Sequence, residues 1–432
     1  MRCQLRVPGC RTLGEPLEQV GVLLLEQAPE QRLACRIVLV EMQVKVIIEH
    51  HIDLLEATAA LPAITFLQIG VGHLSLGKVT VMLAIIYHLP HQWENRCSMQ
   101  ADWQRFLDDQ GAVRDDAGVV RHFHGGGERI LVGDHLAILR VRGVDTEKFL
   151  QGQLTCDLAT VFAGQTRLAM HLSLKGRGMS SFRVLPAEDG VDLVTPRSRV
   201  EDTLAALKKY AMFSKVTLEQ DNARTALLFV GDAGAQLLHA YDIPVPGQPG
   251  EALFAPHTAV ARLENGARYL LLMEHGRAQK MLEQNTVNEL GAADQWRLQD
   301  IIAGEGHIEA GGEDLWLPQV LNYDVLDGVN FKKGCYLGQE IVARMHFKGQ
   351  LKQRMQRRDW PAEQAPTTGT VLRNDAGKAV GEIVTAVCRN GRVSALLVLR
   401  LDHAGDLLIE EHALGSTAAV LPYALPAPTQ QQ

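Results

Sequence analysis

The feature that most constrains the fold is a change of pattern at Met99, after which short apolar runs alternate with amphipathic helical stretches. Apolar runs bounded by turn residues predict strands; they are Ala137–Val141, Leu168–Leu174, Ser181–Leu185 and Val191–Thr195. The glycines of Lys175–Gly178 predict a turn between two of them. Ser198 with Glu201 predicts a capping box at the start of the helix that follows. This hairpin-plus-helix organisation predicts an α+β fold.

A second αβ region is predicted from about Ala226 to Gln284, interrupted by the proline- and glycine-rich linker Pro244–Gly250. Its strand Arg268–Met273 is followed by a predicted helix to Glu283. Strand-like runs then return after residue 366 and predict a small C-terminal β-barrel; they are Ala379–Val387, Val393–Leu399 and Ala418–Leu421. The tail after Leu425 is predicted to be disordered.

Length and composition limit the classes of protein. With 432 residues, 46% of them apolar, the chain can fill two or three domains. Its formal net charge of -7 gives no basic signature for nucleic acid, so any RNA contact would be a local patch or indirect, and we expect no direct tight binding. Seven scattered cysteines without a CxxC pair argue against a metal or self-contained iron-sulfur site and favour a reducing compartment. We expect a cytoplasmic protein without a leader peptide or membrane anchor.

Residues 1–98 differ from the rest of the chain. They hold four of the seven cysteines among valine, isoleucine and leucine runs that have few turn or cap signals. The segment Ala57–Gly77 has no charged residue and is nearly long enough to span a bilayer, but Pro62, Gln68 and several glycines argue against a span. We interpret residues 1–98 either as an added domain or as translated upstream sequence that is absent from the working protein, and we favour the second interpretation.

The segment Phe331–Arg344 (FKKGCYLGQEIVAR) places one thiol, Cys335, beside Lys332, Lys333 and a helix predicted to start near Tyr336. Positive charge and free N–H groups lower the cost of a thiolate. Free cysteines are commonly small buried hydrophobes, but the polar neighbours here are poor core material. No base lies nearby in sequence, and one thiol cannot hold an iron-sulfur cluster. Cys335 would therefore act with a partner, a small thiol or an exogenous cofactor.

The eight residues KGCYLGQE resemble the signature of the YgfZ family of folate-binding proteins, which is related to the glycine-cleavage T-protein, an aminomethyltransferase. Three further segments resemble the family in the same order along the chain: Gly143–Gln153, Lys175–Gly178 and Leu207–Val216. The resemblance runs from about Leu131 to Met355. It carries over Cys335 as the functional thiol; the other motif residues are Lys333, Gly334, Tyr336, Gly338, Gln339 and Glu340.

This resemblance implies an aminomethyltransferase-like folate-binding fold, with a central folate channel and Cys335 near its mouth. It also implies tetrahydrofolate as cofactor, and iron-sulfur proteins or cluster-assembly factors as partners. We expect the chain to divide into an extension (residues 1–98), a first αβ region (99–225), a second αβ region (226–295), a segment with the cysteine motif that completes the folate-binding core (296–355), a C-terminal β-barrel (356–425) and a disordered tail (426–432).

Trp296 lies in a segment that resembles a folate-contacting region of the family, and a flat indole is suited to stacking on a pterin or aminobenzoyl ring. The alternative is a half-buried helix tryptophan. The family's other contacting aromatic falls at Leu136 in this chain. A glutamate of T-proteins that precedes the Ala-Gly pair falls at Ile302, which would remove a partner for the pterin N–H groups. Asp300 would substitute only if the register differed.

Two other features are less specific. The glycines that follow His122-Phe123-His124 lack the lysine and the serine or threonine of a P-loop, which favours a plain loop, and the two histidines have no evident third metal ligand. A basic run follows the cysteine motif and is either a solvated face or an attractor for a polyanion or a folate polyglutamate tail; it comprises Arg344, Lys348, Lys352, Arg354, Arg357 and Arg358.

Two functions are compatible with the resemblance. The favoured one is a folate-binding accessory protein that supports iron-sulfur cluster synthesis or repair, and thereby tRNA modification, through Cys335. The alternative is a tetrahydrofolate-dependent aminomethyltransferase or demethylase, which has the same fold, so the fold cannot separate the two. The cysteine motif, which a transferase does not need, and the apolar Ile302 both favour the accessory function over an enzyme.

Overall fold

The computed structural model describes residues 20–27, 31–38, 49–50, 90–255, 257–284 and 290–426. The chain divides into two units, Met1–Lys78 and Val79–Gln432. In the first unit an antiparallel sheet is formed by β1 (Val20–Gln27), β2 (Gln31–Val38) and β3 (Glu49–His50). Most of the predicted extension, the segment Ala57–Gly77 and residues 427–432 lie outside the described residues. Over the described ranges, the helices are all too short or too polar to cross a membrane.

The first sheet of the second unit has five antiparallel strands in the order β11-β7-β10-β9-β8. They are β7 (Leu136–Arg142), β8 (Arg167–Leu172), β9 (Gly178–Ala187), β10 (Gly190–Pro196) and β11 (Thr217–Gln220). Four of them coincide with the predicted strands. Helices that pack on this sheet are α3 (Thr146–Gln151), α4 (Leu158–Phe162) and α5 (Val200–Ala211).

The predicted capping box at Ser198 is wrong. Residues Arg197–Arg199 form a 3-10 turn, and α5 begins after them with Arg199 as its N-cap residue, without a side-chain capping bond. The Ser198 hydroxyl instead accepts a hydrogen bond from the backbone N–H of Ala310 at 3.2 Å. The Ser198 hydroxyl, which the local pattern assigned to the helix start, therefore makes a tertiary contact instead.

A second sheet of six strands has the order β13-β14-β15-β12-β6-β16. Its strands are β6 (Ile130–Val132), β12 (Arg224–Val230), β13 (Ala252–Ala255), β14 (Thr258–Arg262), β15 (Arg268–Glu274) and β16 (Leu290–Gly291). Its helices are α2 (Pro90–Asp109), α6 (Gly231–Ala240) and α7 (His275–Glu283). A small hairpin of β4 (Ala112–Arg114) and β5 (Val120–Phe123) lies next to it in sequence. Because β6 pairs with β12, the first and second predicted αβ regions share this sheet.

The two sheets pack face to face. Ile138 of β7 and Leu228 of β12 belong to one buried cluster, whereas the neighbouring residues Leu139 and Leu227 belong to the clusters under the helices. Successive side chains of a strand point to opposite faces, so these strands must be apolar on both. The result is two sheets in the middle with helices on both outer sides, and Trp296 in the cluster between the sheets.

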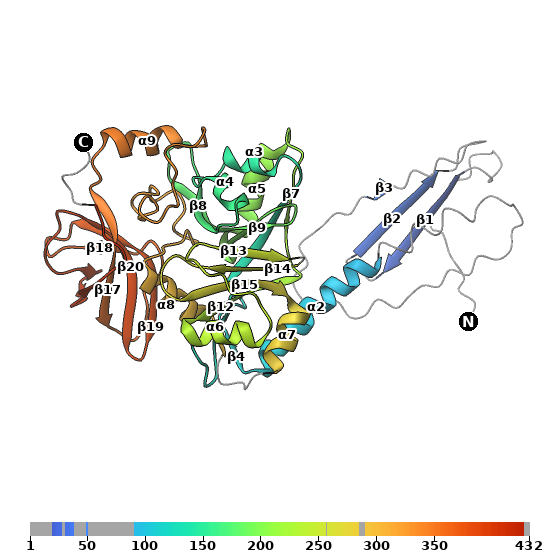
Figure 1. The fold of residues 1–432 in the computed structure, drawn as a ribbon, viewed down its shortest axis with the longest axis horizontal. Helices are drawn as coiled ribbons and strands as arrows, with labels where there is room; N and C mark the ends of the chain where they lie inside the picture. Colours follow the sequence, from blue (N-terminus) through green and yellow to red (C-terminus); the bar gives the residue numbers. More distant parts are fainter. Residues whose placement is uncertain are drawn as a thin grey trace, which may run out of the picture. The chain divides into compact units, whose positions relative to one another are not determined.

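The C-terminal region is a seven-stranded antiparallel sheet that curls into a half-barrel (Figure 1). Its strands are β17 (Gln353–Pro361), β18 (Val371–Arg373), β19 (Ala379–Arg389), β20 (Arg392–Arg400), β21 (Leu408–Ile409), β22 (His412–Ala413) and β23 (Thr417–Ala419). The segment between this sheet and the rest contains α9 (Gln339–Lys348). Strands therefore form where the strand-like runs predicted them, although as a half-barrel.

Helix α8 (Ala293–Ala303) positions the pocket described below. It ends at Gly304, which has a left-handed backbone with φ of 69°, and a Cβ at this position would lie 2.6 Å from the Tyr423 hydroxyl oxygen. Glycine adopts this conformation without strain and leaves room for the tyrosine. The chain can therefore reverse immediately after the helix and return towards it.

Candidate functional site

The Cys335 thiol is exposed on a loop that is fastened to the first sheet region. The Asn330 side-chain oxygen accepts backbone N–H bonds from Lys332 and Lys333 at 2.7 and 2.9 Å. The Lys333 ammonium donates to the carbonyl oxygens of Leu154 and Cys156 at 2.6 and 2.7 Å. The loop therefore holds an exposed thiol on a fixed backbone.

The ammonium group of Lys333 is part of this anchor. It lies 5.0 Å from the centre of the Tyr336 ring, a cation–π distance. Burial lowers the pKa of Lys333 to about 8, while the two carbonyls and the ring stabilise its charged form. Burial raises the pKa of Tyr336 to about 12, so its hydroxyl stays protonated. Lys333 serves to hold the loop, and Lys332 is the exposed lysine of the pair.

The predicted helix start near Tyr336 is wrong, because α9 begins at Gln339. Gly338 precedes it with φ of 77°, and a Cβ there would lie 2.6 Å from the Ser173 carbonyl oxygen, so the chain turns at a position only glycine fits. The Leu337 N–H donates to the Gly152 carbonyl oxygen at 3.1 Å. Cys335 is therefore outside the first turn of the helix, where the dipole acts most strongly.

The other motif residues differ in exposure. Gly334 is exposed, with no atom within 4 Å of the place where a Cβ would be. Tyr336 is buried, and Gln339 is half-buried as the first residue of α9. Glu340 is an exposed acid in the first turn of α9, where a negative charge is favourable.

A polar pocket lies elsewhere, where α8 and the segment after it meet the start of β7. It is lined by His135, Leu136, Pro196, Arg297, Asp300, Glu305, His307, Glu309 and Thr385. Its free volume of about 20 Å³ holds about one water molecule, so a pterin would enter only if the wall side chains moved apart. Leu136 lines this pocket. The motif residues 333–340 do not, so the thiol and the pocket are separate sites.

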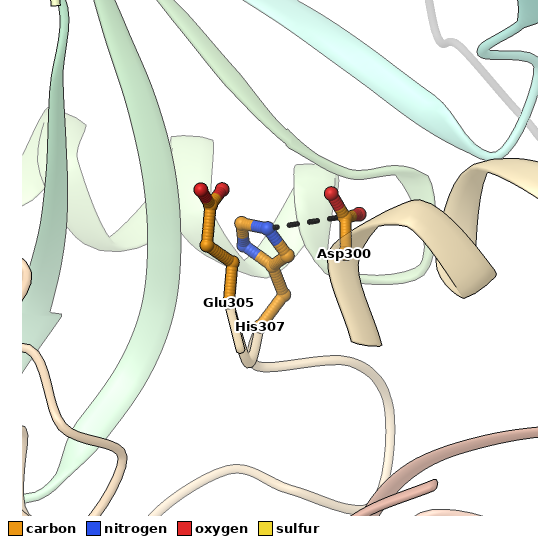
Figure 2. Close-up of side chains that lie close together, drawn as sticks. All are labelled: Asp300, Glu305 and His307. Atoms are coloured by element: carbon orange, nitrogen blue, oxygen red, sulfur yellow. Dashed lines mark ion pairs between the residues drawn. The ribbon is translucent and has the colours of Figure 1, made fainter. Parts of the chain in front are cut away.

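Figure 2 shows Asp300, Glu305 and His307 converging at the pocket, with the imidazole between the two carboxyl groups. Asp300 comes from α8, and the other two side chains come from the segment that returns after Gly304. His307 Nε2 lies 4.0 Å from Asp300 Oδ2, the contact drawn as a dashed line. The turn at Gly304 thus brings three titratable groups together.

Two buried arginines, one from each of the two facing sheets, hold these carboxyl groups. Arg268 of β15 donates to Asp300 Oδ1 at 3.0 Å, and its other terminal nitrogen donates to Glu305 Oε1. Arg183 of β9 donates to Glu305 Oε2 at 2.7 Å and to Glu264 Oε2 at 2.6 Å. Both guanidinium groups therefore bridge two acids, a geometry that the planar fork of arginine allows.

Burial and the two arginines have opposite effects on the pKa values of Asp300 and Glu305. Burial raises the pKa of Asp300 to about 7, against the opposing effect of Arg268. Although burial alone would raise it, the pKa of Glu305 is lowered by Arg268 and Arg183. Burial lowers the pKa of His307 to about 4. Near pH 7 the pocket holds an ionised Glu305, a neutral His307 and an Asp300 that exchanges its proton.

A divalent metal does not suit this cluster. The ligand atoms of Asp300, Glu305 and His307 lie within 4.8 Å of one another, which is close enough to share an ion. Arg268 and Arg183 already bind the carboxylates, however, and an added cation would lie beside two buried guanidinium groups. Like charges in a buried site repel strongly. The arrangement is suited to holding a proton or a polar ring.

Trp296 is buried behind the pocket wall. It is 5% exposed and belongs to the cluster between the sheets. Its ring meets the His135 ring edge-on, with centroids 5.6 Å apart, and His135 lines the pocket. The buried His135 Nδ1 has no hydrogen-bond partner among the described residues. Burial lowers the pKa of His135 well below its usual value, so the ring is neutral and has polar atoms to offer a ligand.

Of the two α8 positions considered for a folate-binding acid, Asp300 lies at the pocket and Ile302 does not. Ile302 is 41% exposed and does not line the pocket, whereas Asp300 is buried and does. Sequence reasoning missed Glu305 and the two arginines. The signal for Asp300 was its position four residues after Trp296, because residues four apart share one face of a helix.

The remaining sequence features form no second site. His122 and His124 lie with ring centroids 6.5 Å apart, and in the described part of the chain neither joins a group of three metal-ligating side chains. The basic run is not a continuous surface. Arg354 is buried and donates to both Asp324 carboxylate oxygens at 3.0 and 2.8 Å, while Arg344, Lys348 and Lys352 are exposed.

Comparisons with known proteins agree with this structure. The chain is 33% identical over 301 residues to the tRNA-modifying protein YgfZ of Escherichia coli O157:H7 (strain EC4115 / EHEC), covering 68% of this chain and 92% of that protein. It is 32% identical, with the same coverage, to the tRNA-modifying protein YgfZ of Escherichia coli O127:H6 (strain E2348/69 / EPEC). No protein-family model matches the chain.

A solved structure gives the fold. The glycine cleavage system aminomethyltransferase T from Bartonella henselae matches with a TM-score of 0.60 and 16% identity, over 74% of this chain and 96% of that structure. This likeness confirms the predicted aminomethyltransferase-like α+β fold.

Proposed function

The chain belongs to the YgfZ family, and on that basis we propose that it is a folate-binding accessory protein that supports iron-sulfur proteins and, through them, tRNA modification. The observation that carries the proposal is Cys335, an exposed thiol on an anchored loop. Such a thiol is open to a partner while its backbone stays in place. A thiolate is a soft nucleophile and a soft metal ligand, which is the chemistry that iron-sulfur clusters use.

A folate would bind at the polar pocket, and its residues suit the chemistry of a pterin. Asp300 can accept or donate a hydrogen bond because burial raises its pKa to about 7, and His135 has an unpartnered ring nitrogen. Leu136 supplies an apolar edge. Tetrahydrofolate, when bound, supplies a one-carbon acceptor. The chain's own residues orient the ring and hold a proton at Asp300.

Folate binding is tested by calorimetry with tetrahydrofolate. Trp296→Ala is a poor probe, because emptying a buried aromatic site costs about 3–5 kcal/mol of stability. Leu136→Asp places a charge in the pocket wall and should weaken binding at least about tenfold. Leu401→Asp makes the same change at a residue that is 39% exposed in the half-barrel region and should bind like the wild type. Equal affinities in both variants would place the folate site elsewhere.

A tetrahydrofolate-dependent aminomethyltransferase or demethylase is the second candidate. The buried Asp300 favours this second function. T-proteins have a glutamate where this chain has Ile302, and Asp300 supplies a carboxyl group to the pocket instead. An aminomethyl-transfer assay on the folate-loaded protein separates the two functions. Binding without turnover supports the accessory function, and turnover supports the transferase.

The thiol is tested by complementation in a strain that lacks its own family member. Cys335→Ser should fail to restore iron-sulfur enzyme activity and modified tRNA nucleosides while it keeps its fold and its affinity for folate. Cys388→Ser is the matched control, because Cys388 is half-buried and its thiol only donates to the Ala362 carbonyl oxygen. Cys156 is fully buried and unsuitable, since a serine there would bury a hydroxyl. Equal rescue by wild type and Cys335→Ser would refute the proposal.

A further inference from the structure

The end of α5 and the turn after it expose large apolar side chains. Phe213 is 95% exposed, Met212 is 76% exposed and Tyr210 is 46% exposed. Helix α5 ends at Ala211, and the Ser214 N–H bonds back to the Ala211 carbonyl oxygen, so residues 212–213 form the outside of a tight turn. Aromatic side chains exposed to this degree at a turn need a reason outside the fold.

Positive charge surrounds these side chains. Lys208, Lys209 and Lys215 are exposed, and none of the three forms an ion pair within the described residues. The nearby Asp145 carboxylate accepts a hydrogen bond from the backbone N–H of Lys215 at 2.7 Å, and it is one negative charge beside the three lysines. That bond also brings the neighbouring Val144, 86% exposed, to the turn. We call this surface the lysine–aromatic patch; it consists of Val144, Lys208, Lys209, Tyr210, Met212, Phe213 and Lys215.

A short chain of contacts links the patch to the thiol loop. The Tyr210 ring lies 6.2 Å from the His171 ring in an edge-on contact. His171 forms a β-bridge with Leu154, and the Leu154 carbonyl oxygen accepts the hydrogen bond from Lys333. The patch and the loop that carries Cys335 are therefore connected through one residue of β8, His171.

We propose that the lysine–aromatic patch binds RNA, with phosphates on the three lysines and an unpaired base stacked on Phe213. Aromatic faces beside lysines are the usual means of binding single-stranded nucleic acid. Seven residues are too few for a stable protein interface, which uses about 20–30 residues on each side, but they match one or two nucleotides with their phosphates. The inference rests on the proposed function, since it names tRNA as the partner. It agrees with a net charge of -7, because the contact is local and not tight.

The test is fluorescence anisotropy with one labelled tRNA and the full chain. With three phosphate contacts, affinity should fall about 20- to 40-fold between 50 and 200 mM salt. Lys208→Glu/Lys209→Glu should weaken binding at least about tenfold, and Phe213→Ala about tenfold through lost stacking. The matched control is Arg373→Glu/Lys378→Glu, the same charge change on exposed residues of the half-barrel region, and it should bind like the wild type.

Three results would overturn the inference: no tRNA binding by the wild type at 50 mM salt, unchanged binding by both patch variants, or displacement of tRNA by poly-L-glutamate at equal charge. The last result would mean that the patch serves acidic proteins. The variants alter exposed side chains, and an unchanged midpoint of thermal unfolding shows that they fold. If the wild type complements the deletion strain without binding tRNA, this inference fails and the proposed function stands. If it binds tRNA without complementing, the proposed function fails.

Discussion

The polar pocket and the Cys335 loop differ in whether the reactive side chain is buried or exposed. In the pocket Asp300 and Glu305 are buried, and Arg183 and Arg268 bind them directly. At the loop the thiol is exposed, and it is the half-buried side chain of Lys333 that anchors the backbone. In the pocket, stability and chemistry therefore depend on the same side chains. At the loop, stability depends on Lys333 and chemistry on Cys335.

This difference shows which changes each region tolerates. A buried charge that loses its partner costs far more than the pair contributed, because the remaining charge has no water to solvate it. An exposed side chain can be replaced within about 0.5 kcal/mol. The pocket should thus be sensitive to any change in its charged residues, while the loop can lose its thiol and keep its fold.

The largest effect is expected for Arg268→Ala. It leaves Asp300 and Glu305 without their shared donor in a buried site, and the free energy of unfolding should fall by about 3–5 kcal/mol. Urea denaturation measures it. Arg400→Ala, which removes an arginine paired with Asp402 at the surface, is the control and should leave the unfolding curve unchanged. Equal effects of both variants would mean that the pocket charges are solvated.

The strands of the first sheet could be predicted because apolar runs and glycine turns are local signals. Leu136–Arg142 and Gly190–Pro196 form where the pattern predicted them, since their apolar residues point to both faces and both faces are covered. The start of α9 could not be predicted. It depends on Gly338 fitting against the Ser173 carbonyl oxygen, a contact between segments far apart in sequence.

The residues of the candidate sites also fall into those that the sequence could predict and those that it could not. The cysteine motif is contiguous, so its residues could be singled out from the sequence. The pocket acids are held by Arg183 and Arg268, which come from two different strands, and no spacing predicts such a pair. The placement of Asp300 was within reach of helical periodicity, because it follows Trp296 by four residues, whereas Ile302 points to another face.

At the loop, Lys333→Met should have a smaller effect than the arginine change. Methionine keeps the apolar stem but leaves the carbonyl oxygens of Leu154 and Cys156 without their donor, which costs about 1–3 kcal/mol. Hydrogen exchange of residues 330–338 should become faster, and the midpoint of thermal unfolding should fall. The exposed Lys332→Met should change neither. If both variants behave alike, Lys333 does not anchor the loop.

The smallest effect is expected in the pH dependence of the stability of Asp300→Asn. It tests whether the pocket holds a buried acid that titrates. Burial raises the folded-state pKa of Asp300 to about 7, above its unfolded value of about 3.9. Between these values the folded protein binds the extra proton, so the contribution of this group to stability is present at low pH and is lost as the pH rises towards 7. Asparagine keeps an acceptor for Arg268 and does not titrate.

Relative to the wild type, Asp300→Asn should therefore gain at least about 1.4 kcal/mol between pH 4.5 and pH 8, the equivalent of one pKa unit. Urea unfolding at the two pH values measures this difference. The surface variant Asp402→Asn is the control, and its stability relative to wild type should show no such gain over the same range, since its carboxylate is exposed. If the two variants follow the same pH dependence, Asp300 is ionised over the whole range. The carboxylate in the pocket would then be solvated like an exposed group, as the thiol at the loop is.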